Sequence, residues 1–186
     1  MKFFSLTSNG KLTQLVKEIG ISTWDELVFF VKNLPYGRNS NRTDFSLVLT
    51  ERKGTCSSKH GFLKEVAMEN GMNHVKLMLV LFKMNGENTP KLESFFSNTT
   101  FNYIPEAHTL LRINGVPIDA THTNSDFSKI EKAVISETEI QPKQLSAFKT
   151  KAHKEYLKNW IATENITHSL EAIWKMREHC IEILSK

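Results

Sequence analysis

The spacing of hydrophobic residues predicts that the chain begins with two helices. Residues 12–19 place Leu and Val side chains on one face of a helix that stops at Gly20. The next helix is expected to start at a capping box, with Ser22 as the cap and Asp25 near the exposed amides. Because the residue before a proline disfavours helix, this second helix should end at about Leu34.

The middle of the chain predicts a loop, a helix and a buried strand. Tyr36–Asn41 is polar and contains a glycine, as in a loop, while the short apolar stretch Phe45–Leu49 fits a helix or a strand. Cys56–Asn70 has helical spacing and is followed by Gly71, which is typical of the position after a helix end. Val75–Met84 is almost continuously apolar, as expected for a strand buried on both faces.

A β-hairpin and two further helices complete the prediction. Asn114-Gly115 separates Ala107–Ile113 from Val116–Thr121, and Asn-Gly between such runs is the strongest short-range hairpin signal. Residues 144–162 and a segment capped near Thr167 are predicted as helices. Helices around a mainly antiparallel sheet define an α+β fold.

The two-residue turn fixes which hairpin residues share a face of the sheet. If the ladder continues beyond the turn, Leu110 lies opposite Asp119 and His108 opposite Thr121. His108 and Asp119 are then diagonal neighbours with Cα atoms about 7–8 Å apart, close enough for their side chains to hydrogen-bond. The opposite face is apolar and comprises Ala107, Leu111, Ile113, Val116, Ile118 and Ala120.

Composition indicates a single cytoplasmic domain spanning residues 1–186. Of these residues 40% are hydrophobic and 24% charged, and the formal charge of +4 is spread along the chain rather than clustered. This distribution argues against a nucleic-acid partner, and no apolar run approaches the ~20 residues needed to cross a membrane. Two cysteines do not suggest a disulfide framework, so a reducing cytoplasm is expected.

Cys56 is the residue with the clearest chemical potential. A thiolate is the reactive form of cysteine, and the N-terminus of a helix, with Thr55 as cap, lowers the thiol pKa. The Cys56 N–H can also stabilise an oxyanion, and a second donor is expected from the preceding loop, with Asn39 or Tyr36 as candidates. His108 is the expected base and Asp119 the carboxylate that orients it.

Other polar residues allow alternative interpretations. His60 lies one helical turn after Cys56 and is an alternative base or a substrate-binding residue, although we favour packing beside the site or contact with solvent. A metal site would draw on Cys56, His60, His108, Asp119 and His122, but no metal-binding motif supports it, and we expect neither metal nor cofactor. Cys180 is expected to be a buried filler, and His153, His168 and His179 to lie on helix surfaces.

Residues 50–122 resemble the transglutaminase-like superfamily of papain-like thiol enzymes. The resemblance rests on Gly54-Thr55-Cys56, the following helix, Glu106-Ala107-His108 and Ile118-Asp119-Ala120-Thr121. It implies a papain-like core in which Cys56 is the nucleophile, His108 the base and Asp119 the orienting acid. Residues 1–49 and 142–186 would then be helical additions to this core. The chain differs from the usual family pattern at Ser57, where an aromatic residue is common.

The sequence therefore predicts a thiol enzyme that cleaves or transfers an amide or acyl group through a thioester. Hydrolysis is favoured over cross-linking, and the expected partner is a peptide, a protein or a small amide substrate. The alternative is an inactive fold of the same family that binds a peptide or protein in its cleft.

Overall fold

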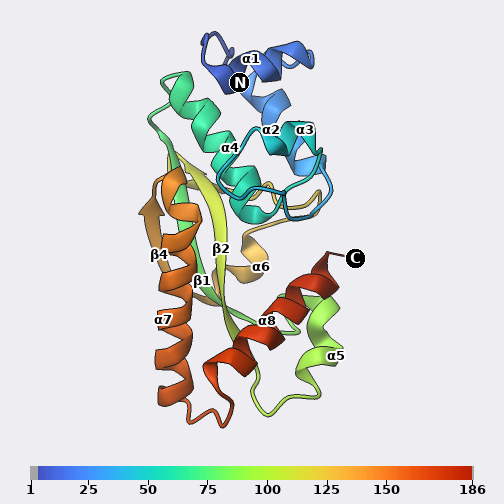
Figure 1. Cartoon of the computed structure of the whole chain (residues 1–186), viewed down its shortest axis with the longest axis vertical. Helices are drawn as coiled ribbons and strands as arrows, with labels where there is room; N and C mark the ends of the chain where they lie inside the picture. The colour runs from blue at the N-terminus through green and yellow to red at the C-terminus, as the bar shows by residue number, and fades with distance from the viewer. Residues whose placement is uncertain (1–3, 186) are drawn as a thin grey trace.

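Helices surround a four-stranded antiparallel sheet in the computed structural model, which describes residues 4–185 (Figure 1). The predicted α+β class is confirmed. The strands lie in the order β3-β2-β1-β4. Their bounds are β1 (Val75–Met84), β2 (Ile104–Ile113), β3 (Val116–Ile118) and β4 (Val134–Ile140).

Three N-terminal helices lie next to α4 (Cys56–Glu69), at the top of Figure 1. The capping box of the second helix lies one residue later than predicted, with Thr23 as cap and Glu26 as its partner. The Glu26 carboxylate reaches back to the Ser22 and Thr23 amides, a reach that Asp25 does not provide. These helices are α1 (Lys11–Glu18), α2 (Trp24–Asn33) and α3 (Leu47–Thr50).

Helix α4 begins at the cysteine and packs on one face of the sheet. Thr55 caps it, as expected, by accepting a hydrogen bond from the Ser58 amide, while the Ser58 hydroxyl accepts one from the Thr55 amide. Gly71 follows the helix end with a φ of 68°, a conformation that glycine adopts without strain. The apolar face of α4 joins β1 and β2 in one cluster that includes Phe62, Leu63, Val66, Leu77, Leu79 and Leu111.

The C-terminal helices belong to a second cluster on the opposite face of the sheet. It includes Met78, Val80 and Leu110 of the sheet together with Leu157, Trp160 and Ile173 of the helices, so β1 is covered on both sides as its apolar run predicts. His153 is buried rather than on a helix surface, with Nε2 2.8 Å from the Pro105 carbonyl oxygen. The helical segments that contribute to this cluster are η1 (Pro90–Leu92), α5 (Glu93–Phe96), α6 (Ser128–Glu131), α7 (Ala147–Thr163) and α8 (Leu170–Leu184). The short helix η2 (Pro142–Leu145) instead contributes Leu145 to the first cluster.

The predicted hairpin is present but shorter than expected. Asn114 and Gly115 both have positive φ, and the register runs from Ile113 opposite Val116 to Leu111 opposite Ile118, as predicted. Strand β3 ends there, so the expected ladder pairs at Asp119 and Thr121 do not form. The amides take other acceptors, because Ala120 N–H donates to His60 Nε2 and Thr121 N–H donates to Asp119 Oδ1.

Within residues 4–185, no helix combines the length and apolar character required to span a bilayer.

Candidate active site

The three residues predicted as a triad come together from three elements. Cys56 is the first residue of α4, His108 lies in the middle of β2, and Asp119 directly follows β3. His108 Nε2 is 2.9 Å from Asp119 Oδ2, so the contact predicted from the turn is present even though the ladder stops earlier. The other imidazole nitrogen, Nδ1, is not used by Asp119, and His108 lies near enough to Cys56 to lower the pKa of its thiol.

Asp119 is held so that it fixes the orientation of the imidazole. One carboxylate oxygen accepts the His108 contact, and the other accepts a hydrogen bond from Thr121 N–H at 2.9 Å. Burial alone would raise the pKa of Asp119, but the charge and hydrogen bond of His108 hold that pKa well below its usual range. An ionised Asp119 requires His108 to donate from Nε2, which leaves Nδ1 to exchange a proton with the thiol.

Cys56 and His108 form a thiolate–imidazolium pair. Burial opposes charge on both, but the attraction of Asp119, its hydrogen bond and the contact with Cys56 raise the pKa of His108 to about 10. For Cys56 the burial effect is outweighed by the Lys149 ammonium and by His108, which together lower the thiol pKa to about 6. Between these two values the sulfur is deprotonated and the imidazole protonated.

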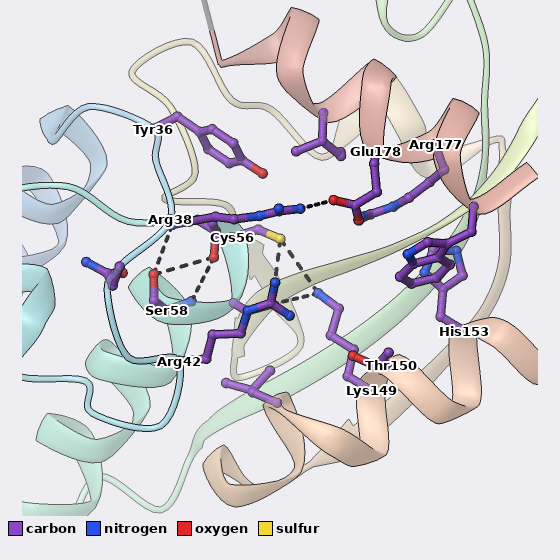
Figure 2. Close-up of a pocket in the computed structure, with 16 residues that line it drawn as sticks. Tyr36, Arg38, Arg42, Cys56, Ser58, Lys149, Thr150, His153, Arg177 and Glu178 are labelled. Atoms are coloured by element: carbon purple, nitrogen blue, oxygen red, sulfur yellow. Dashed lines mark hydrogen bonds and ion pairs between the residues drawn. The ribbon is translucent and has the colours of Figure 1, made fainter. Parts of the chain in front are cut away.

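Lys149 is the functional residue that sequence reasoning missed. This buried side chain comes from α7 and places its Nζ 3.7 Å from Cys56 Sγ (Figure 2). The same nitrogen lies 2.7 Å from Ser57 Oγ and 2.8 Å from Thr109 Oγ1. The two hydroxyls fix the ammonium beside the sulfur. The α7 sequence contains several lysines, and nothing in their spacing distinguishes Lys149 from those that face solvent.

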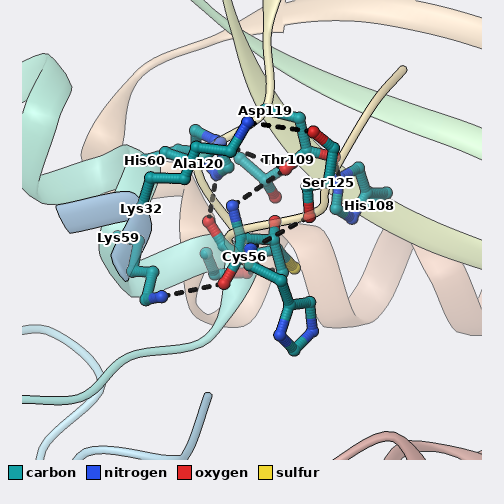
Figure 3. Close-up of polar contacts among 12 residues, drawn as sticks. Lys32, Cys56, Lys59, His60, His108, Thr109, Asp119, Ala120 and Ser125 are labelled. Atoms are coloured by element: carbon teal, nitrogen blue, oxygen red, sulfur yellow. Dashed lines mark hydrogen bonds and ion pairs between the residues drawn. The ribbon is translucent and has the colours of Figure 1, made fainter. Parts of the chain in front are cut away.

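His60 supports the site but cannot act as its base. Its side chain is fully buried, so it packs beside the site, as one of the two favoured expectations had it, and does not contact solvent. His60 Nδ1 donates to the Cys56 carbonyl oxygen at 2.7 Å, and Nε2 accepts from Ala120 N–H at 2.8 Å (Figure 3). Burial lowers the pKa of His60 to about 4, which keeps the ring neutral. His60 therefore ties the first turn of α4 to the segment that carries Asp119.

The two candidates for the second oxyanion donor differ in their contacts. The Asn39 amide nitrogen donates to the carbonyl oxygens of Leu47 and Lys53 and to Glu51, so it organises the loop and has no hydrogen left for a substrate. Tyr36 borders Cys56 in both cavities described below, and its hydroxyl has no protein hydrogen-bond partner within residues 4–185. Burial, together with the negative charge of Cys56, raises the pKa of Tyr36, which keeps the phenol a donor.

Cys56 lies between two cavities that differ in size and lining. The smaller one, of about 100 Å³, is bordered by Ser57 of α4, by Lys149 of α7 and by residues of α8. The larger one, of about 610 Å³, contacts His108 and Asp119 and includes apolar side chains such as Phe82 and Met84. Tyr36, Cys56 and Ile181 are common to both, so a substrate can lie across the sulfur with one half in each cavity.

A buried ion pair neutralises a carboxylate that lies close to the Cys56 thiolate. Glu106 of β2 points to the same region as Cys56 and on its own raises the thiol pKa. Arg177 of α8 binds the Glu106 carboxylate through Nε and Nη2, with side chains only 13% and 7% exposed respectively. Burial raises the pKa of Glu106, but the Arg177 charge prevails and lowers it to about 2.

The residues considered for a metal site serve other contacts. His60 uses both ring nitrogens, and His122 stacks on Tyr36 with ring centroids 4.9 Å apart. Within residues 4–185 no group of three or more His, Cys, Asp or Glu side chains has an arrangement suited to a metal ion.

Comparison of the chain with protein-family models, curated proteins and solved structures found no match.

Proposed function

We propose that the protein is a thiol enzyme that hydrolyses an amide through a Cys56 thioester, as its resemblance to the transglutaminase-like superfamily implies. The observation that carries this proposal is that His108, which is bound to Asp119, and Lys149 both lie close to the Cys56 sulfur and lower the pKa of its thiol. A cysteine that only fills space does not require two cations beside its sulfur, as Cys56 has in His108 and Lys149. Cys180 is such a cysteine, and burial raises the pKa of its thiol to about 12.

Acylation begins with attack of the Cys56 thiolate on the substrate carbonyl carbon. Protonated His108 then gives its Nδ1 proton to the leaving nitrogen, the C–N bond breaks and a thioester remains. In the second half, neutral His108 takes a proton from water, the resulting hydroxide equivalent attacks the thioester, and the C–S bond breaks to return the thiolate. Asp119 retains the Nε2 proton of His108 throughout and stabilises the imidazolium.

Two donors are suited to the oxyanion of the tetrahedral intermediates. The Cys56 N–H belongs to the first turn of α4, where a helix offers no carbonyl partner. The Tyr36 hydroxyl is the second donor, since it borders the sulfur in both cavities and remains protonated.

The Tyr36→Phe variant is expected to lower kcat for 4-nitrophenyl acetate about 10²–10³-fold, because one preorganised oxyanion donor is lost. Alkylation of Cys56 by iodoacetamide forms no oxyanion, so its rate should stay close to that of the wild type. Tyr103→Phe is the matched control, since the Tyr103 hydroxyl contacts Glu164, away from the sulfur. If kcat fell by the same factor in Tyr103→Phe, Tyr36 could no longer be assigned as the oxyanion donor.

The thiolate itself can be tested by the pH dependence of alkylation. The rate of iodoacetamide labelling should rise to half its maximum near pH 6, the value of the Cys56 pKa, rather than near the ~8.5 of a free thiol. Mass spectrometry should locate the label on Cys56, and Cys56→Ala should abolish it while Cys180→Ala has no effect. A midpoint typical of a free thiol would favour the inactive binding fold.

Lys149→Met should move that midpoint upward by at least about one pH unit, because the cation nearest the thiolate is replaced by a neutral side chain of similar length. Lys149→Arg, which keeps the charge, should move it less. Equal shifts in both variants would mean that packing, rather than charge, determines the thiol pKa.

A further inference from the structure

The smaller cavity beside Cys56 concentrates positive charge. Four cationic side chains border it, against a single carboxylate. The cations are Arg38, Arg42, Lys149 and Arg177, and the carboxylate is Glu178.

Two of these cations are already neutralised by protein carboxylates. Arg38 pairs with Glu178, and Arg177 pairs with Glu106 and Glu178. Lys149 contacts only hydroxyls and the Cys56 sulfur, while Arg42 has no ion-pair partner within residues 4–185. Figure 2 shows the Arg42 guanidinium pointing to the same side of the cavity as Cys56 and Lys149. Arg42 is therefore a positive charge that no carboxylate of the described residues balances. Lys149 becomes a second one when acylation removes the negative charge of the Cys56 thiolate.

The position of His108 decides which half of a substrate meets these charges. His108 borders the larger cavity and not the smaller one. The leaving nitrogen must receive its proton from His108, so the leaving group occupies the larger cavity. The acyl group, which stays on the sulfur, then enters the smaller and cationic cavity.

Building on the proposed function, we infer that the acyl group of the substrate carries a carboxylate that binds Arg42 and Lys149. The substrate class is a half-amide of a short dicarboxylic acid, since the smaller cavity has room for only a few atoms beyond the carbonyl. The planar fork of an arginine matches a carboxylate geometrically, and a lysine adds a second point charge.

The overall reaction balances without any further reactant. The half-amide and one water give the dicarboxylate and a protonated amine. Cys56 forms and then breaks the bond to the acyl carbon, His108 carries the proton to the leaving nitrogen, and water supplies the second carboxylate oxygen. The net charge of −1 is the same on both sides.

Competition between two alkylating reagents tests this subsite directly. Iodoacetate and iodoacetamide have the same leaving group and similar size, but only iodoacetate carries a carboxylate. An ordinary thiolate repels the anion, so it reacts more slowly with iodoacetate. We expect Cys56 to react faster with iodoacetate than with iodoacetamide, and succinate but not succinamide to protect it.

Arg42→Gln should lower the ratio of iodoacetate to iodoacetamide rates about five- to tenfold, as expected for an arginine that is open to solvent. Lys151→Gln removes the same charge from an exposed residue that borders a neighbouring cavity together with Arg42, and it should leave the ratio unchanged. If the rate ratio falls equally in the two variants, the preference for iodoacetate comes from the overall positive charge of this surface and not from a subsite, and the inference is overturned.

Two failures are distinguishable in this experiment. A wild-type Cys56 that labels with a midpoint near pH 6 but shows no preference for iodoacetate overturns the anionic subsite and leaves the thiol enzyme standing. A Cys56 that labels with the midpoint of a free thiol contradicts the proposed function and, with it, the inference that rests on it.

Two anilide substrates test whether the carboxylate belongs to the acyl half or to the leaving half of the substrate. Succinyl 4-nitroanilide carries the carboxylate on the acyl side, and 4-butyramidobenzoate carries it on the leaving side. Faster turnover of the first, lost in Arg42→Gln, supports the inference, whereas faster turnover of the second reverses the orientation and overturns it. If neither anilide turns over, the ratio of alkylation rates decides.

Discussion

Asp119→Asn is expected to lower the rate at which 4-nitrophenyl acetate acylates Cys56 about 10³–10⁴-fold. The Asn oxygen can keep the hydrogen bond from Thr121 N–H, so its NH₂ group would face His108 Nε2. That nitrogen must then act as acceptor, and the ring proton moves to Nδ1, on the side of the sulfur. The imidazole can no longer accept the thiol proton, and the positive charge that Asp119 stabilises is lost.

The measurement is nitrophenolate release after rapid mixing, together with the pH midpoint of Cys56 alkylation. The midpoint should rise in Asp119→Asn, because a neutral His108 no longer stabilises the thiolate. Asp44→Asn is the matched control, since Asp44 only caps a turn through Ser46. An Asp119→Asn variant with normal acylation and a normal midpoint would show that the carboxylate is structural.

The contact between His108 and Asp119 could be predicted from sequence because its geometry is local. Asn114-Gly115 determines a two-residue turn, and the turn brings His108 of β2 close to Asp119, which directly follows β3. The N-terminus of α4 is equally local, since Thr55 and Ser58 cap it from within four residues of sequence. The catalytic role of these residues stays a prediction, but their placement follows from short-range signals.

Lys149 could not be predicted because its role depends on long-range packing. It is 93 residues from Cys56 in sequence, and only the docking of α7 beside α4 and β2 brings its ammonium to the sulfur. The pairing of Glu106 with Arg177 has the same character, since 71 residues separate the partners. Charged residues on a predicted helix are usually assigned to solvent, and sequence periodicity alone does not reveal such buried exceptions.

The strands of the fold also differ in how well the sequence predicts them. Strand β1 has the predicted bounds because its apolar run is buried by helices on both faces. Strand β4 was not predicted, since it is an edge strand whose Ser, Glu and Thr residues are largely open to solvent. The strand predicted to run to Thr121 ends at Ile118, because His60 captures the amide of Ala120.

Arg177→Met is expected to lower the free energy of unfolding by about 3–5 kcal/mol at neutral pH, the largest stability effect that we anticipate. The substitution keeps an apolar stem but leaves the Glu106 carboxylate buried without a partner. The same ion pair joins α8 to β2, so its loss also loosens the helix that borders both cavities. The unpaired Glu106 should in addition raise the pKa of Cys56.

Chemical denaturation of Arg177→Met, Arg38→Met and the double variant Arg177→Met/Glu106→Gln separates charge burial from lost packing. Arg38 pairs with Glu178 in a solvent-exposed contact, with side chains 49% and 28% exposed, so its loss should cost less than about 1 kcal/mol. The double variant should recover more than half of the stability lost in Arg177→Met, because no unpaired charge remains. A double variant as unstable as the single one would assign the effect to packing of the Arg177 stem.

The pH dependence of the Arg177→Met effect has a definite sign. Glu106 has its pKa lowered from 4.5 to about 2 in the folded protein, so the ion pair contributes its full stability above the unfolded value. That contribution is lost as the pH falls from about 4.5 towards 2, where the folded carboxylate takes up a proton. The difference in stability between the wild type and Arg177→Met should therefore shrink on acidification, because the variant no longer contains a carboxylate whose pKa the fold depresses. A difference that stays constant over this range would mean that the Glu106 charge contributes nothing, and that α8 is held on β2 by its apolar contacts alone.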